Sequence, residues 1–114
     1  MAMSETYRNA IADAGGALIT HIGLVNSSGV EISGGGYARQ AVTWTTANDG
    51  IIRPTADLVF NIPAGTTVGG WRGFSASTAG TNYGGADLTN ETFAGAGQYK
   101  LLASGTGIQH SDAV

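Results

Sequence analysis

The side chains best suited to chemistry in this chain are two histidines and a scattered set of carboxylates. His21 falls within an alternating apolar segment and His110 falls near the C-terminus, and neither belongs to a His-x-His or His-x-x-x-His pair. A histidine-based zinc site therefore lacks its usual spacing, and we interpret His21 as a strand or interface residue. The chain has no cysteine, which excludes a disulfide, a thiolate metal site and a cysteine nucleophile.

Paired acids are the next chemistry to consider, because glycoside hydrolysis needs two carboxylates about 5–10 Å apart across a groove. The carboxylates stand singly in expected turns and strand ends, and no Gly-x-Ser-x-Gly motif offers a serine nucleophile. Spacing singles out no pair among Glu31, Asp49, Asp57, Asp87 and Glu91. We therefore predict a protein that is not an enzyme and that uses no metal ion and no cofactor.

A run of three glycines, Gly34 to Gly36, suggests a phosphate-binding loop at first sight. A P-loop needs a lysine and a following helix, and the dinucleotide fingerprint also opens a helix. Here the glycines lead into an alternating segment, in which Tyr37 and Arg39 lie on the face opposite Trp44. We predict a structural loop that allows positive φ, and we expect Arg39 to be either an exposed residue or an intersubunit contact.

The composition narrows the classes of partner. Five basic and eight acidic residues among 114 give a formal net charge of −3, which disfavours nucleic-acid binding. No apolar run approaches the roughly 20 residues of a membrane-spanning helix. The first residues, MAMSETYRNAIADAGG, lack the pattern of a secretory signal, so we expect a protein made in a cytoplasm.

The chain predicts one helix, over Ser4 to Ala14. Ser4 is a suitable N-cap and Glu5 suits the first turn, and Gly15 and Gly16 are expected to end the helix. Four apolar residues fall at i, i+3, i+4 and i+7 and form a stripe that could dock onto a neighbour. They are Tyr7, Ala10, Ile11 and Ala14.

From Ala17 onward the apolar residues alternate with a period of two, in short segments separated by turns. This pattern predicts a mainly β protein, an antiparallel β-sandwich (jelly-roll-like) with a short N-terminal α-helix. We expect a helix and docking segment over residues 1–16, a sandwich over 17–104 and a loose C-terminal tail over 105–114.

Several of these segments together resemble a known family. They are ALITHIGLVNSSG, EISGGGYARQAVTW and NIPAGTTVGGWRGFSAS, followed by YGGADLTNETFAGAGQYKL. They are similar to small virion proteins of tailed phages, especially phages that infect actinobacteria. The resemblance covers Ser4 to Leu102, and GGGYARQ followed by TFAGAGQY is its most distinctive part. The chain departs from the family between Leu24 and Glu31, where relatives often carry a longer loop.

The resemblance implies a structural protein of the virion and no catalytic residue. We expect a minor tail or tail-fibre component, or a capsid decoration protein, that assembles as a homotrimer or as repeated copies on other phage structural proteins. Six residues are candidate interface or core anchors: Tyr7, Ile11, Tyr37, Arg39, Trp44 and Trp71.

The alternative is a carbohydrate-binding module for host surface glycans. An exposed aromatic platform with polar neighbours would serve such a site, and the candidate residues are Trp71, Arg72, Asn82, Tyr83 and Asp87. The two alternatives differ in one observable property, because a glycan platform requires Trp71 to be exposed.

Overall fold

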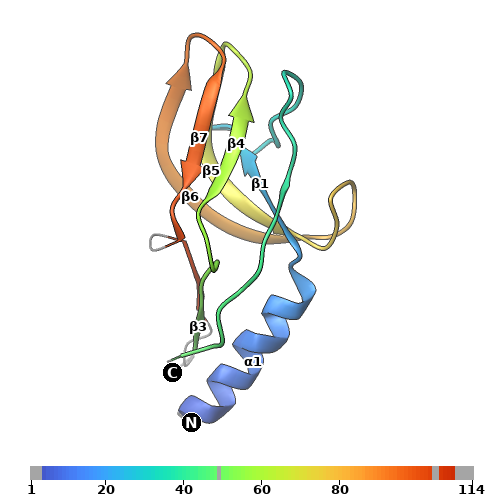
Figure 1. Ribbon diagram of the computed structural model, residues 1–114, viewed down its shortest axis with the longest axis vertical. Coiled ribbons are helices and arrows are strands. Elements are labelled where there is room, and N and C mark those ends of the chain that lie inside the picture. Colours follow the sequence, from blue (N-terminus) through green and yellow to red (C-terminus); the bar gives the residue numbers. More distant parts are fainter. Residues whose placement is uncertain (1–3, 49, 104–105, 110–114) are drawn as a thin grey trace.

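The computed structural model describes residues 4–48, 50–103 and 106–109 and is mainly β with an N-terminal helix, as the sequence predicts (Figure 1). It is elongated, with extents of 49 × 24 × 23 Å, and the helix lies at one end. The elements in chain order are α1 (Glu5–Leu18), β1 (His21–Val25), β2 (Gln40–Ala41), β3 (Ile51–Ile52), β4 (Leu58–Ile62), β5 (Thr66–Phe74), β6 (Asn82–Phe93), β7 (Gly97–Leu101) and β8 (Ile108–Gln109).

The described strands pair antiparallel in three sheets. One sheet has four strands in the order β2-β1-β5-β6, and the pairs β4-β7 and β3-β8 form two-stranded sheets. A jelly roll has eight strands in a double sheet, and the described strands do not show that arrangement. The antiparallel class is therefore confirmed, whereas the jelly-roll variant is not.

The main hydrophobic core lies where the four-stranded sheet and the β4-β7 pair face each other. In β4, Phe60 and Ile62 are buried whereas Val59 and Asn61 are exposed, which is the alternation expected of a half-buried strand. The buried residues of this core are Ile22, Leu24, Ile32, Phe60, Ile62, Val68, Trp71 and Leu101.

Three segments differ from what the apolar pattern indicates. β6 continues through residues 89–93 to Phe93, although the sequence shows no clear alternation there. Ile108–Gln109, predicted as part of a loose tail, pairs with β3. Of the expected strand from Tyr37 to Trp44, only Gln40–Ala41 forms a strand. Trp44 makes an isolated β-bridge with Pro54. An alternating apolar pattern indicates which side chains share a face of the chain. Whether the segment forms a strand also depends on hydrogen bonding to a neighbouring strand, which the pattern does not reveal.

The helix is longer than predicted. Its N-cap is confirmed, because the amide of Tyr7 donates to Oγ of Ser4 at 3.2 Å, but α1 runs through both glycines to Leu18. At Gly16 a Cβ would lie 3.0 Å from Cδ1 of Ile52 and 3.3 Å from Cδ1 of Trp44. The glycine therefore allows a close approach to the indole ring and does not end the helix. None of the described helices has the length and apolarity needed to cross a membrane.

Candidate functional site

Trp44 joins the helix to the sheets. Its half-buried ring packs against both hydrophobic clusters, the sheet core and a smaller cluster of Ala12, Ala47 and Ile52 beneath α1. Its Nε1 donates a hydrogen bond of 2.8 Å to the carbonyl of Ile19, at the C-terminal end of the helix. The sequence predicted Trp44 as a core or interface anchor, and within this chain it is the anchor of α1.

Two hydrogen bonds hold α1 against the segment that precedes β3, which we call the β3 turn. The side of α1 that makes them is its inner face. Oδ1 of Asn9 accepts from the amide of Gly50 at 2.7 Å, and Oδ1 of Asp13 accepts from the amide of Ala47 at 2.8 Å. Ala12 is buried between these two positions. The inner face therefore consists of residues 9, 12, 13 and 16, which share one side of a helix because they are three or four positions apart.

The opposite side of α1 is apolar and faces away from the β structure. Tyr7 is 56% exposed and Leu18 is 54% exposed, Ala14 is exposed and Ile11 is half-buried. These four residues, which we call the outer stripe, follow each other at intervals of four, three and four positions. Three of them were predicted from the sequence. Leu18 was missed because the helix was expected to end at Gly15, although it continues the same spacing.

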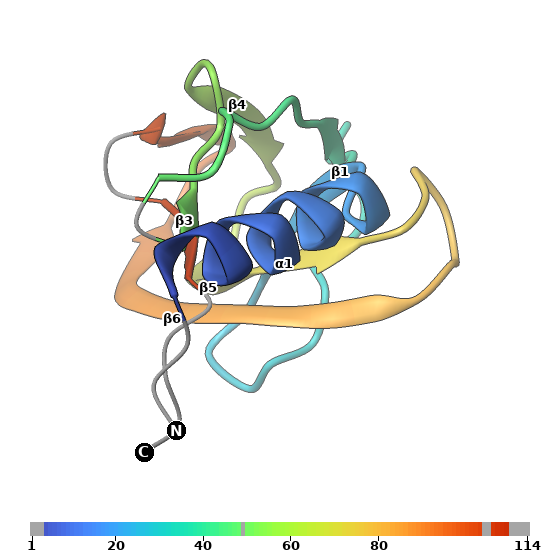
Figure 2. The same ribbon diagram turned by 90° about the horizontal axis from the view of Figure 1, so that it is seen from below.

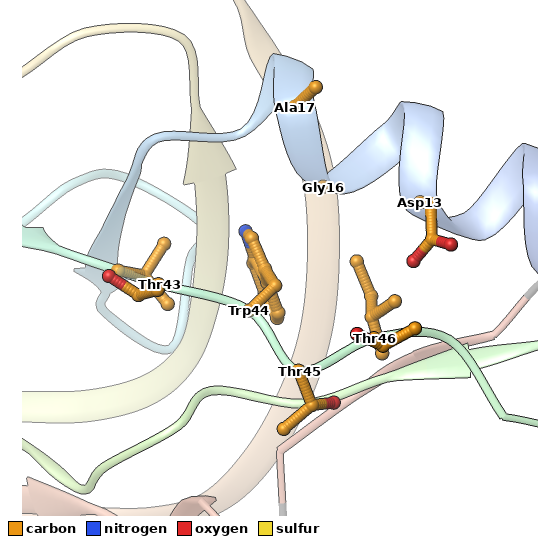
Figure 3. A pocket seen from close by; sticks show the side chains of 9 residues that line it. Asp13, Gly16, Ala17, Thr43, Trp44, Thr45 and Thr46 are labelled. Atoms are coloured by element: carbon orange, nitrogen blue, oxygen red, sulfur yellow. The ribbon is translucent and has the colours of Figure 1, made fainter.

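A cleft of about 360 Å³ lies between α1 and residues 42–46 (Figure 3). Asp13, Gly16 and Ala17 line it from the helix, and Ile52 contributes from β3. The remaining lining residues are Val42, Thr43, Trp44, Thr45 and Thr46. In Figure 3, Asp13 and Thr46 lie on one side of the indole ring and Thr43 lies on the other. No pattern in the sequence indicated this cleft, because residues 13–17 and residues 42–46, which form its two walls, are far apart in the chain.

Arg39 is not an ordinary exposed residue, because its side chain is only 10% exposed. The expectation that it contacts another subunit stays a prediction. Its Nε and Nη2 each donate a hydrogen bond of 2.8 Å to the carboxylate of Glu31. Its Nη1 donates to the carbonyls of Ala76 at 3.1 Å and Ala79 at 2.7 Å. The guanidinium also lies 3.6 Å from the ring centre of Phe74. Arg39 therefore ties the glycine-rich loop to the loop between β5 and β6.

Tyr37 completes this cluster. Its hydroxyl accepts from the amide of Leu24 at 2.8 Å and donates to Oε2 of Glu31 at 3.0 Å, and its ring stacks on Phe60. Burial raises the pKa of the Tyr37 hydroxyl. The hydrogen bonds from Arg39 hold the pKa of Glu31 below its usual value, because they favour the charged carboxylate. The polar groups of the loop are thus engaged with one another, as expected of a structural loop.

The predicted glycan platform does not form as expected. Trp71 is only 3% exposed and belongs to the sheet core, so its ring cannot receive a sugar. Nη1 of Arg72 donates to the carbonyl of Trp71 at 2.8 Å, and Oδ1 of Asn82 accepts from the amide of Gly84 at 2.8 Å. Tyr83 and Asp87 are exposed on β6. The five residues lie on adjacent strands, but the central aromatic ring is buried.

The candidate metal and acid residues also have structural contacts. Nδ1 of His21 is 2.9 Å from Oγ1 of Thr20, and Oδ1 of Asp57 accepts from the amide of Ala103 at 2.8 Å. Within residues 4–48, 50–103 and 106–109, no three histidine, cysteine or acidic side chains come together as metal ligands would. His110 and Asp49 lie outside the described residues.

Replacing Arg39 by lysine should lower the free energy of unfolding by about 2 kcal/mol, because lysine cannot reproduce the two-pronged contact with Glu31. Urea unfolding followed by circular dichroism measures the change. The matched control is Arg72→Lys, since the Arg72–Asp87 pair is 3.4 Å long and its carboxylate is 91% exposed. An equal loss in the two variants would contradict the structural role of Arg39.

Replacing Glu31 by glutamine should make the unfolding free energy less sensitive to acid. A carboxylate with a lowered folded pKa stabilises the protein above its unfolded pKa, close to 4.5, and this contribution is lost as the pH falls through the folded value. The stability difference between wild type and Glu31→Gln should therefore be largest at neutral pH and shrink as the pH falls below the unfolded pKa of about 4.5. A difference that does not change with pH would contradict this role for the ionised carboxylate.

Comparison with known protein families, with curated proteins and with solved structures finds no match to this chain. The function is therefore argued from the residues and their geometry. Two features stand out: the outer stripe of α1 and the cleft beside Trp44.

Proposed function

We propose that this protein is a non-enzymatic structural component of a bacteriophage particle, which assembles as symmetric copies through the outer stripe of α1. The observation that supports the assembly role is that one face of α1 packs against the β structure and the other is apolar and largely exposed. Contacts to Gly50 and Ala47 fix one face to the β structure, while three of the four apolar residues of the outer stripe are exposed on the other face.

The occupant of the stripe is α1 of other copies of this chain. Intervals of four, three and four positions are those of apolar residues at helix–helix seams, so the stripe is complementary to a copy of itself. Its flanks are the small residues Ala10, Gly15 and Ala17, which allow a second helix to approach closely.

The area of the stripe favours more than two copies. Fourteen residues form a helix about 21 Å long and about 10 Å wide, which offers roughly 200 Å² to a partner. A stable pair buries about 800 Å² on each side, so two helices alone are insufficient. Three helices around a common axis bury both flanks of each stripe, and a larger scaffold adds further contacts. We therefore propose a homotrimer, held in place on other structural proteins of the particle.

The location in a virion rests on the sequence resemblance from Ser4 to Leu102. We place the protein in the tail, as a minor tail or tail-fibre component, with capsid decoration as the alternative. The non-enzymatic part of the proposal is supported by the side chains that chemistry would need. Glu31, Asp13 and Asp57 each accept hydrogen bonds that hold the fold together.

Light scattering across a dilution series tests the assembly role. The wild-type protein should approach three times its chain mass of 11.5 kDa at high concentration, because association buries the outer stripe. The double variant Ile11→Ser, Leu18→Ser should have the mass of a single chain at the same concentrations and keep the wild-type circular dichroism spectrum.

The matched control is Val30→Ser, which removes an apolar side chain that is 60% exposed in a turn away from the helix. This variant should associate like the wild type. A wild-type mass of one chain at every concentration would contradict the homotrimer. Equal association of the double variant and the wild type would show that the outer stripe is not the interface.

A further inference from the structure

We propose that the cleft between α1 and residues 42–46 binds a neutral saccharide, with the indole of Trp44 as the surface on which a sugar ring stacks. This inference does not rest on the assembly role, because Trp44, Asp13 and Thr46 line the cleft and none of them belongs to the outer stripe. It also replaces the sugar site predicted at Trp71, whose ring is buried.

The indole ring of Trp44 is held in place before any ligand arrives. Its Nε1 donates a hydrogen bond of 2.8 Å to the carbonyl of Ile19. Gly16 lies close to the Cγ–Cδ1 edge of the ring. The half-buried ring forms a wall of the cleft (Figure 3). A fixed aromatic face loses little conformational entropy on binding, and it can contact the apolar C–H face of a sugar ring.

The rim beside this ring carries groups suited to sugar hydroxyls. Oδ1 of Asp13 is used by the amide of Ala47, whereas Oδ2 makes no hydrogen bond with the described residues. The hydroxyl of Thr46, on the same side of the ring as Asp13 (Figure 3), also has no hydrogen-bond partner within the described part of the chain and lines the cleft. A carboxylate accepts and a threonine hydroxyl both donates and accepts, which matches the mixed character of sugar hydroxyls.

The charge of the lining residues and the volume of the cleft indicate which class of ligand it can bind. It contains no lysine or arginine, so nothing there attracts a phosphate or another anion. A cation would use Asp13 and the indole face, but it would leave the Thr46 hydroxyl without a role. The volume of about 360 Å³ lies at the lower end of small-ligand sites, which suits a mono- or disaccharide.

Nitrogen–proton correlation NMR on the labelled full chain tests the proposal. The two tryptophans give two indole N–H signals, which Trp44→Phe assigns. The probes are glucose, galactose, N-acetylglucosamine and their β-linked disaccharides, each added to about 20 mM, so that a dissociation constant as weak as the millimolar range is detected. At least one sugar should move the Trp44 signal in a saturable way, while the signal of buried Trp71 stays in place.

A variant locates the binding in the cleft. Thr46→Val keeps the shape of an exposed side chain but removes the hydroxyl, and it should weaken the sugar by roughly fivefold, as expected for one lost hydrogen bond. Thr78→Val, in the exposed loop between β5 and β6, is the matched control and should bind like the wild type.

Two results would overturn the proposal. Either no sugar of the panel moves the Trp44 signal, or Thr46→Val binds the sugar as tightly as the wild type does. The double variant Ile11→Ser, Leu18→Ser should still bind the sugar, which separates a failure of this proposal from a failure of the assembly role.

Discussion

The close contact between Gly16 and the indole of Trp44 is the constraint on which the other features depend. The absence of a side chain at position 16 lets α1 lie directly over the ring, with Ile52 beside it. The ring in turn joins the small cluster under the helix to the main core between the sheets. A larger residue at position 16 would push the helix away, and both the cleft and the orientation of α1 would change with it.

This contact fixes the rotation of the helix about its own axis. Once Gly16 faces Trp44, Asn9 and Asp13 reach the amides of the β3 turn, and the outer stripe necessarily faces away from the protein. A helix of this length is marginal alone, so its inner contacts maintain it while its outer face stays available. The same rotation brings Asp13 to the rim of the cleft. Figure 2 shows α1 lying across the end of the β structure.

Period-two alternation was sufficient to predict a mainly β protein, and the burial of Phe60 beside exposed Val59 follows it directly. The end of the helix was predicted wrongly, because glycine is both a helix terminator and the residue of closest approach, and only the tertiary contact with Trp44 distinguishes these uses. Tyr37 was predicted on the face opposite Trp44, but both residues pack against the main core. The partners of Arg39 at positions 31, 76 and 79 follow from loop positions that alternation does not encode. The phage location stays a prediction from resemblance.

Cross-linking through a single cysteine tests most directly whether α1 is the seam between copies. The chain has no cysteine, so Ala14→Cys places one thiol at the centre of the outer stripe, and Ala94→Cys places a matched exposed thiol in the turn between β6 and β7. Under mild oxidation, the account predicts rapid disulfide-linked dimers for Ala14→Cys and slow, collision-driven linkage for Ala94→Cys. Equal rates for the two variants would contradict the account.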